Sequence, residues 1–121
     1  MRKERVARKE RLALQVGIAL TAGVFGAVPV AEGAPVLDKV VTAGTQVAQS
    51  GSITDVTGTQ QNNIVKWTDF SVNQGETVRF DKGAQEKNYL NLVTGPKTSE
   101  IAGAIEGGKD VYLVNPHGVI F

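Results

Sequence analysis

The chain has 121 residues, a length that limits it to one domain. Its formal net charge is +1. It contains no cysteine, and this excludes disulfides, thiolate metal sites and thiol nucleophiles. From Ala34 onward there are seven Lys and Arg against nine Asp and Glu, so this part lacks the basic surplus of nucleic-acid-binding proteins and no nucleic-acid partner is expected.

The first 33 residues have the organisation of a secretory signal peptide. Six basic residues precede Leu12, and no charged residue occurs from Leu12 to Ala31. Basic, apolar and small-residue segments in this order are typical of export signals. A membrane anchor is the alternative, because about 20 apolar residues span a bilayer. Three glycines and Pro29 within the run favour the signal. We predict a signal peptide over residues 1–33 and an exported domain over residues 34–121.

Signal peptidase is predicted to cleave after Gly33, following translocation by the Sec machinery. Ala31 and Gly33 place small residues at the two recognised positions, and the new N-terminus is Ala34 rather than Pro35. N-terminal sequencing of periplasmic or secreted protein should therefore begin at Ala34. A start at Met1 in a membrane fraction would contradict the signal-peptide hypothesis.

After the leader, short apolar runs alternate with Gly, Asn, Asp and Ser. The runs are Val40–Val41, Gln46–Ala48, Ile53 with Val56, Ile64–Trp67, Phe70–Val72, Thr77–Phe80, Tyr89–Val93 and Val111–Val114. Short strand-like runs separated by turn residues indicate an all-β chain. Only Ser99–Ile105 has the spacing of a helical turn, and Gly103 weakens that pattern.

The segment from Asp110 to Phe121 predicts a strand, a tight turn and a second strand. Asn115, Pro116 and Gly118 suit the first, second and fourth positions of a β-turn, and His117 takes the third, which faces solvent. Apolar residues continue to Phe121, so we expect the domain to be incomplete at this end and to continue as further stacked coils.

No enzymatic site is predicted, and neither a metal nor a cofactor is expected. His117 is the one histidine, and no partner base or ligand lies near it in sequence. The carboxylates are scattered without an acid–base motif, and no Gly-x-Ser-x-Gly elbow occurs. Trp67 and Phe70 fit either a sugar-stacking pair or a core pair. The core is favoured, with Phe80 as a further cap or core aromatic.

Three segments carry a family resemblance. They are Asn63–Phe80, then Asn91–Gly95 followed by Ser99–Ile105, and finally Val111–Phe121. In this order they resemble the filamentous haemagglutinin-type two-partner secretion domain, although His117 and Leu92 stand where that family often has Asn and Arg. The resemblance implies the N-terminal cap and first coils of a right-handed parallel β-helix. It also implies a large exoprotein (adhesin, cytolysin or contact-dependent toxin) recognised by an outer-membrane transporter with periplasmic domains.

Two functions from different classes are compatible with these residues. The first is a secretion-recognition module of an adhesin- or haemagglutinin-type exoprotein, which the transporter reads and which seeds β-helix folding. The turn Asn115–Gly118 is then either the recognised feature or a structural corner. Addition of a transporter strand at the edge of Thr77–Phe80 is one docking mode.

The alternative is a carbohydrate- or matrix-binding adhesin domain that acts by itself. Trp67, Tyr89 and Tyr112 would then contact host-cell or matrix glycans. In both cases the protein is expected to pass through the periplasm and to be secreted, or held at the cell surface, in a bacterium with an outer membrane.

Overall fold

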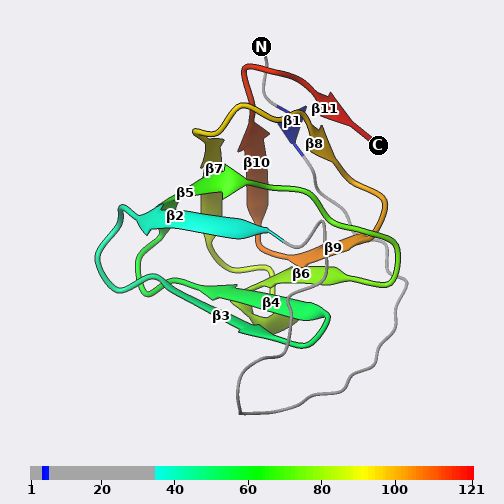
Figure 1. Cartoon of the computed structure of the whole chain (residues 1–121). Coiled ribbons are helices and arrows are strands. Elements are labelled where there is room, and N and C mark those ends of the chain that lie inside the picture. Colours follow the sequence, from blue (N-terminus) through cyan, green and yellow to red (C-terminus); the bar gives the residue numbers. More distant parts are fainter. Residues whose placement is uncertain (1–3, 6–34) are drawn as a thin grey trace.

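The computed structural model describes Glu4–Arg5 and residues 35–121 (Figure 1). The predicted cleavage site lies outside the described residues, as does the signal peptide apart from β1. The strands are β1 (Glu4–Arg5), β2 (Val36–Val40), β3 (Gln46–Ser50), β4 (Ile53–Thr57), β5 (Asn62–Asp69), β6 (Thr77–Phe80), β7 (Asn88–Val93), β8 (Ser99–Glu100), β9 (Ala104–Gly107), β10 (Asp110–Val114) and β11 (Val119–Ile120). One 3₁₀ turn, η1 (Asp81–Gly83), interrupts them. The all-β prediction is confirmed.

Successive coils of the chain stack in parallel on three sides. On one side β6 pairs with both β4 and β9, and on the next β7 pairs with both β5 and β10. On the third side a parallel bridge joins Val72 to Ile101, and β8 pairs with β11. Each coil thus adds one strand or bridge to each side, as Figure 1 shows for β4, β6 and β9. This is the start of a β-helix-type stack, as predicted, and its right-handed sense stays a prediction.

Antiparallel strands cover the first coil. β2 pairs with β5, and β3 forms a hairpin with β4. Gly51 in the hairpin turn has φ 59°, a left-handed conformation that Gly adopts without steric cost. At the other end, β1 pairs antiparallel with β10. The stack β4-β6-β9 therefore begins on the antiparallel strand β3, and the stack β5-β7-β10 begins on the antiparallel strand β2. We call β2 and β3 the cap strands.

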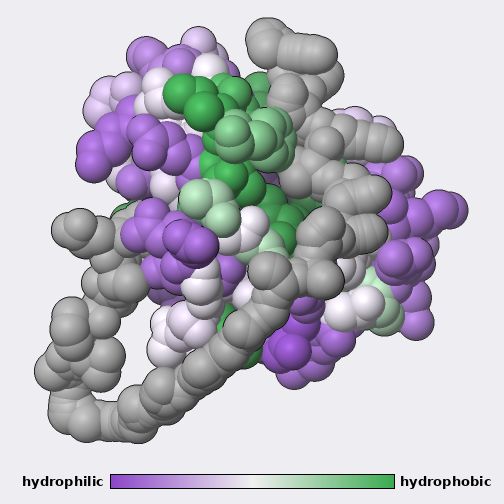
Figure 2. Space-filling view, turned by 90° about the vertical axis from the view of Figure 1, so that its right-hand side faces the viewer, coloured by the Kyte–Doolittle hydropathy of each residue, from purple (hydrophilic) through white to green (hydrophobic). Residues whose placement is uncertain are grey.

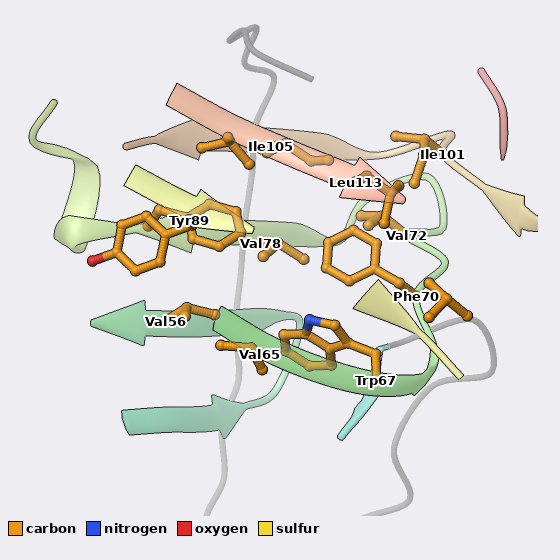
Figure 3. Close-up of a cluster of buried hydrophobic side chains, with 13 residues drawn as sticks. Val56, Val65, Trp67, Phe70, Val72, Val78, Tyr89, Ile101, Ile105 and Leu113 are labelled. Carbon is orange, nitrogen blue, oxygen red and sulfur yellow. The ribbon is translucent and has the colours of Figure 1, made fainter. Parts of the chain in front are cut away.

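Alternating burial along the strands builds the core between the three sides. In β5, Val65 and Trp67 are fully buried while Ile64 and Lys66 face outward, which is the period of two expected for a strand. The core cluster, drawn in Figure 3, comprises Val56, Val65, Trp67, Phe70, Val72, Val78, Phe80, Tyr89, Val93, Ile101, Ile105, Val111 and Leu113.

Ser99–Ile105, the one segment with helical spacing, forms no helical turn, because Ser99–Glu100 is strand β8 and Ile101 bridges Val72. Two local predictions were wrong. Phe70–Val72 is not a strand and holds only that bridge. Thr77–Phe80 is not an edge, because the backbone of β6 is paired to β4 on one side and β9 on the other. A strand cannot be added there without displacing a neighbour.

No helix among the described residues is long and apolar enough to cross a membrane.

Candidate functional site

The Asn115 side chain organises the corner between β10 and β11. Asn115 is 3% exposed. Its Oδ1 accepts the backbone N–H of His117 at 2.8 Å, and its Nδ2 donates to Lys97 O at 2.9 Å and to Ser99 Oγ at 2.9 Å. The backbone closes the turn through Gly118 N–H to Asn115 O at 3.0 Å. One buried amide thus fixes the turn and ties it to the coil before it.

The other three residues of the turn form its exposed tip. Pro116, His117 and Gly118 are all exposed. Gly118 has φ 105°, which a residue with a Cβ adopts only with strain. The Thr98 hydroxyl donates to His117 O at 2.9 Å, and Ser99 N–H donates to Gly118 O at 3.0 Å. The tip is therefore a rigid, solvent-facing feature whose shape the backbone determines.

The candidate aromatics lie in the core rather than on the surface. Trp67 and Phe80 are 0% exposed and Phe70 is 1% exposed. The rings of Trp67 and Phe70 meet edge to face with centroids 5.2 Å apart (Figure 3). Trp67 Nε1 donates to Asn91 Oδ1 at 2.9 Å. A ring enclosed on both faces cannot stack on a sugar. The sugar-stacking interpretation of Trp67 with Phe70 is wrong for this reason.

Tyr89, a second aromatic residue proposed to contact glycans, is also buried. Tyr89 is 1% exposed, and its ring packs against Phe80 with centroids 4.9 Å apart. Tyr112, at 36% exposure, is the one member of that trio at the surface. A lone exposed tyrosine is a weaker basis for glycan binding than an aromatic cluster.

The Tyr89 hydroxyl anchors a loop that the sequence pattern did not reveal. It donates to the Asp81 carboxylate and accepts Gly58 N–H at 2.9 Å. The same carboxylate accepts the backbone N–H of Glu86 and Lys87, at 3.1 and 2.8 Å. Burial and the hydrogen bond to Asp81 raise the pKa of Tyr89. The phenol therefore stays neutral, and its role is structural.

Glu76 is a buried carboxylate at the turn before β6. It is 7% exposed, and its Oε1 accepts Asn73 N–H at 2.8 Å while its own N–H donates to Asn73 O at 2.9 Å. Burial raises the pKa of Glu76, and the bond from the Asn73 backbone partly lowers it. Because the charged form is disfavoured in the folded state, the folded protein binds this proton more tightly than the unfolded chain does.

This pKa shift predicts how Glu76→Gln changes stability with pH. The contribution of wild-type Glu76 to folding is fully present below its unfolded pKa, about 4.3, and is lost as pH rises through the raised folded value. Glutamine keeps an acceptor for Asn73 N–H without the charge. The free energy of unfolding of E76Q should thus increase relative to that of the wild type as pH rises above the unfolded pKa of Glu76. Urea melts of both proteins at increasing pH measure the difference. A difference that is constant with pH, or that reverses, would contradict the assignment.

The described residues contain no group of three or more His, Cys, Asp or Glu side chains that could hold a metal ion. The clearest charged pair there is Arg79 with Asp55, which meet through two bonds of 2.7 and 3.0 Å. These side chains face outward on β6 and β4, as cross-strand partners. The pair links β4 to β6 on the outer surface of the sheet, and it does not form a recognisable catalytic or binding motif.

The fold and the corner define a stacked-coil β domain of the kind that begins a β-helix. The chain belongs to the TPS secretion domain family, whose sequence model matches residues 35–121. It therefore carries a TPS secretion domain, and exoproteins with this domain are secreted from Gram-negative bacteria.

The chain is also similar to two curated Haemophilus influenzae proteins, each named heme/hemopexin-binding protein. One, from strain Rd, is 29% identical over 90 residues, which is 74% of this chain and 10% of that protein. The other is 34% identical over 56 residues, which is 46% of this chain and 6% of that protein. The chain thus spans a small part of the relatives it matches.

Proposed function

We propose that residues 35–121 are the part of an exported, non-enzymatic exoprotein that its outer-membrane transporter recognises in the periplasm. The observation that carries the proposal is the family match over this whole region, which includes the ordered Asn115–Gly118 corner. The signal peptide predicted ahead of it supplies the route: the Sec machinery and signal peptidase deliver the chain to the periplasm, and the transporter then moves it out.

The geometry of the corner supports a role in recognition. A partner gains affinity from a surface that is already ordered, because less conformational entropy is lost on binding. The exposed tip formed by Pro116, His117 and Gly118 is held from below by three side-chain bonds of buried Asn115. The tip thus presents a fixed shape to solvent without exposing the core.

The stacked coils support the second part of the proposal, in which this domain seeds the folding of further coils in the parent exoprotein. Ile120 and Phe121 are 58% and 72% exposed, and Figure 2 shows hydrophobic atoms gathered toward the end of the molecule that carries β11. A further coil stacked on β11 would bury them. Because β1 lies inside the predicted signal peptide, cleavage after Gly33 would also free the outer edge of β10 for the next strand.

Two experiments on the parent protein test recognition. Deleting residues 35–121 while keeping the leader should leave the parent in the periplasm instead of the medium. Overproducing the 121-residue chain in cells that secrete the intact parent should slow parent secretion by occupying the transporter. A matched chain from another periplasmic protein is the control for load on the export machinery. Normal secretion in both cases would refute the proposal.

The ligand of the parent protein is a separate question. The relatives' name says that they bind heme or hemopexin, whereas the resemblance of this chain to haemagglutinin-type proteins favours an adhesin. His117 is the one histidine of the chain, and it lies in an exposed turn where its backbone N–H and C=O make the hydrogen bonds that hold the tip. Its exposed imidazole belongs to no cluster of metal-binding side chains among the described residues, and we infer that it is not a heme ligand. Hemin should give the same absorption spectrum with the wild type and His117→Asn, and a spectral difference would contradict this inference.

A further inference from the structure

Two edge strands lie at the cap end of the described residues, and they differ in how they are protected. β2 is the outer strand of the sheet that contains β5, and β3 is the outer strand of the sheet that contains β4. An edge strand presents unpaired backbone groups, so soluble proteins block such edges with charge, proline or irregular pairing.

β2 carries all three of these features. Pro35 precedes it, Asp38 and Lys39 lie on it, and its register with β5 shifts twice, between Val36 and Leu37 and between Leu37 and Lys39. A second strand pairing along this edge would meet a bent backbone and two charged side chains. The edge of β2 is therefore a poor docking strand.

β3 carries none of them. Gln46–Ser50 contains no charged residue and no proline, and all five residues pair with β4 in an unbroken register. The neutral stretch is longer than the strand, because no charged residue occurs from Val41 to Thr54. This uncharged stretch is the sequence signal that would have pointed to β3 as an open edge.

The backbone of β3 is nevertheless held firmly from inside. Val47 packs against the core, and Gln49 Nε2 donates to Pro35 O at 2.7 Å and to Thr54 Oγ1 at 3.2 Å. On the opposite face, Gln46 and Ser50 are exposed. The strand is thus fixed in an extended conformation with an accessible outer edge, and a partner strand would lose less entropy in joining it.

We propose that β3 is the docking edge for the transporter, which adds an extended segment of its periplasmic part to the four-stranded sheet β3-β4-β6-β9. This inference rests on the proposed function, since family membership supplies the transporter as partner and the unguarded edge supplies the surface. Main-chain hydrogen bonds provide the affinity in this mode of recognition. The edge of β3 would accept an uncharged transporter strand. That strand would place an apolar residue on the face of the sheet that carries Val47 and polar residues on the face that carries Gln46 and Ser50.

The test introduces positive charge at this edge in one variant and negative charge in another. The variants are Gln46→Lys with Ser50→Lys, and Gln46→Glu with Ser50→Glu; both positions are exposed and are cross-strand partners of uncharged Thr57 and Ile53. Gln74 and Gln85, which are exposed and outside the strands, take the same substitutions as controls for net charge. The protein is purified from the periplasm of cells that lack the transporter, and its binding to the transporter's periplasmic part is measured after thermal melts verify folding.

Both edge variants should bind about tenfold or more weakly, while both control variants bind like the wild type. Amide hydrogen exchange in Gln46–Ser50 should slow in the wild-type complex. Edge variants that bind normally would overturn the proposal and leave the proposed function intact. A change in transporter binding that reverses with the sign of the introduced charge would also overturn the proposal. Edge variants that lose self-association but keep transporter binding would do the same. Absence of wild-type binding would instead refute the proposed function.

Discussion

Replacing Trp67 with Ala is expected to destabilise the domain by about 3–5 kcal/mol, the range for removing a large aromatic from a core. Trp67 is fully buried, packs edge to face on Phe70 and donates its indole N–H to Asn91. The substitution leaves a cavity between coils and an unpaired amide oxygen. Because marginal domains have only about 5–15 kcal/mol of stability in total, this change should remove much of it.

Graded substitutions separate the two causes. Trp67→Phe retains much of the apolar volume and loses the bond to Asn91 Oδ1, so it should cost less than Trp67→Ala. Val41→Ala, at a position 46% exposed, serves as the surface control and should change stability by less than about 0.5 kcal/mol. Urea-induced unfolding measures all three. If Trp67→Ala were as mild as Val41→Ala, the assignment of Trp67 to the core would be wrong.

Replacing Asn115 with Ala is expected to impair both stability and secretion. The variant loses three side-chain hydrogen bonds and leaves Lys97 O, Ser99 Oγ and His117 N–H without this partner, at a cost of about 1–3 kcal/mol. If the transporter reads the corner, secretion of the parent should fall further than this loss of stability explains. Thermal melts and secreted yield, measured on the same variants, provide the comparison.

Two matched variants make the comparison decisive. Val65→Ala destabilises the core at a fully buried position without touching the corner, and it calibrates how secretion depends on stability. His117→Asn changes the exposed tip, retains turn-compatible chemistry and should leave secretion unchanged. Normal secretion from Asn115→Ala, together with failure of His117→Asn, would reverse the roles assigned to these two residues.

The sequence predicted the fold class and the corner because both depend on local chemistry. Short β-branched and aromatic runs between turn residues determine strands, and the burial of Val65 and Trp67 follows the period of two that the sequence already displays. The Asn-Pro-x-Gly pattern determines its turn through its own side-chain and backbone preferences.

Strand neighbours depend on long-range packing and were not predictable in the same way. Thr77–Phe80 was expected to be an edge, but the stacking of β4 and β9 on its two sides makes it internal. Alternation says which face of a strand is buried, and it does not say which strands lie beside it. The hydrogen bond from Tyr89 to Asp81 could not be predicted from the sequence either, because it joins a strand to a loop. The backbone of that loop is left-handed at Asp81 and Lys82, and no local sequence motif predicts this conformation.

The central claim is that the transporter recognises residues 35–121. Calorimetric titration of the periplasm-accumulated protein with the periplasmic part of its transporter tests it most directly. Saturable binding is predicted for the wild type, with weaker binding for Asn115→Ala and wild-type binding for His117→Asn. A protein that melts cooperatively yet produces no binding at any accessible concentration would contradict the claim.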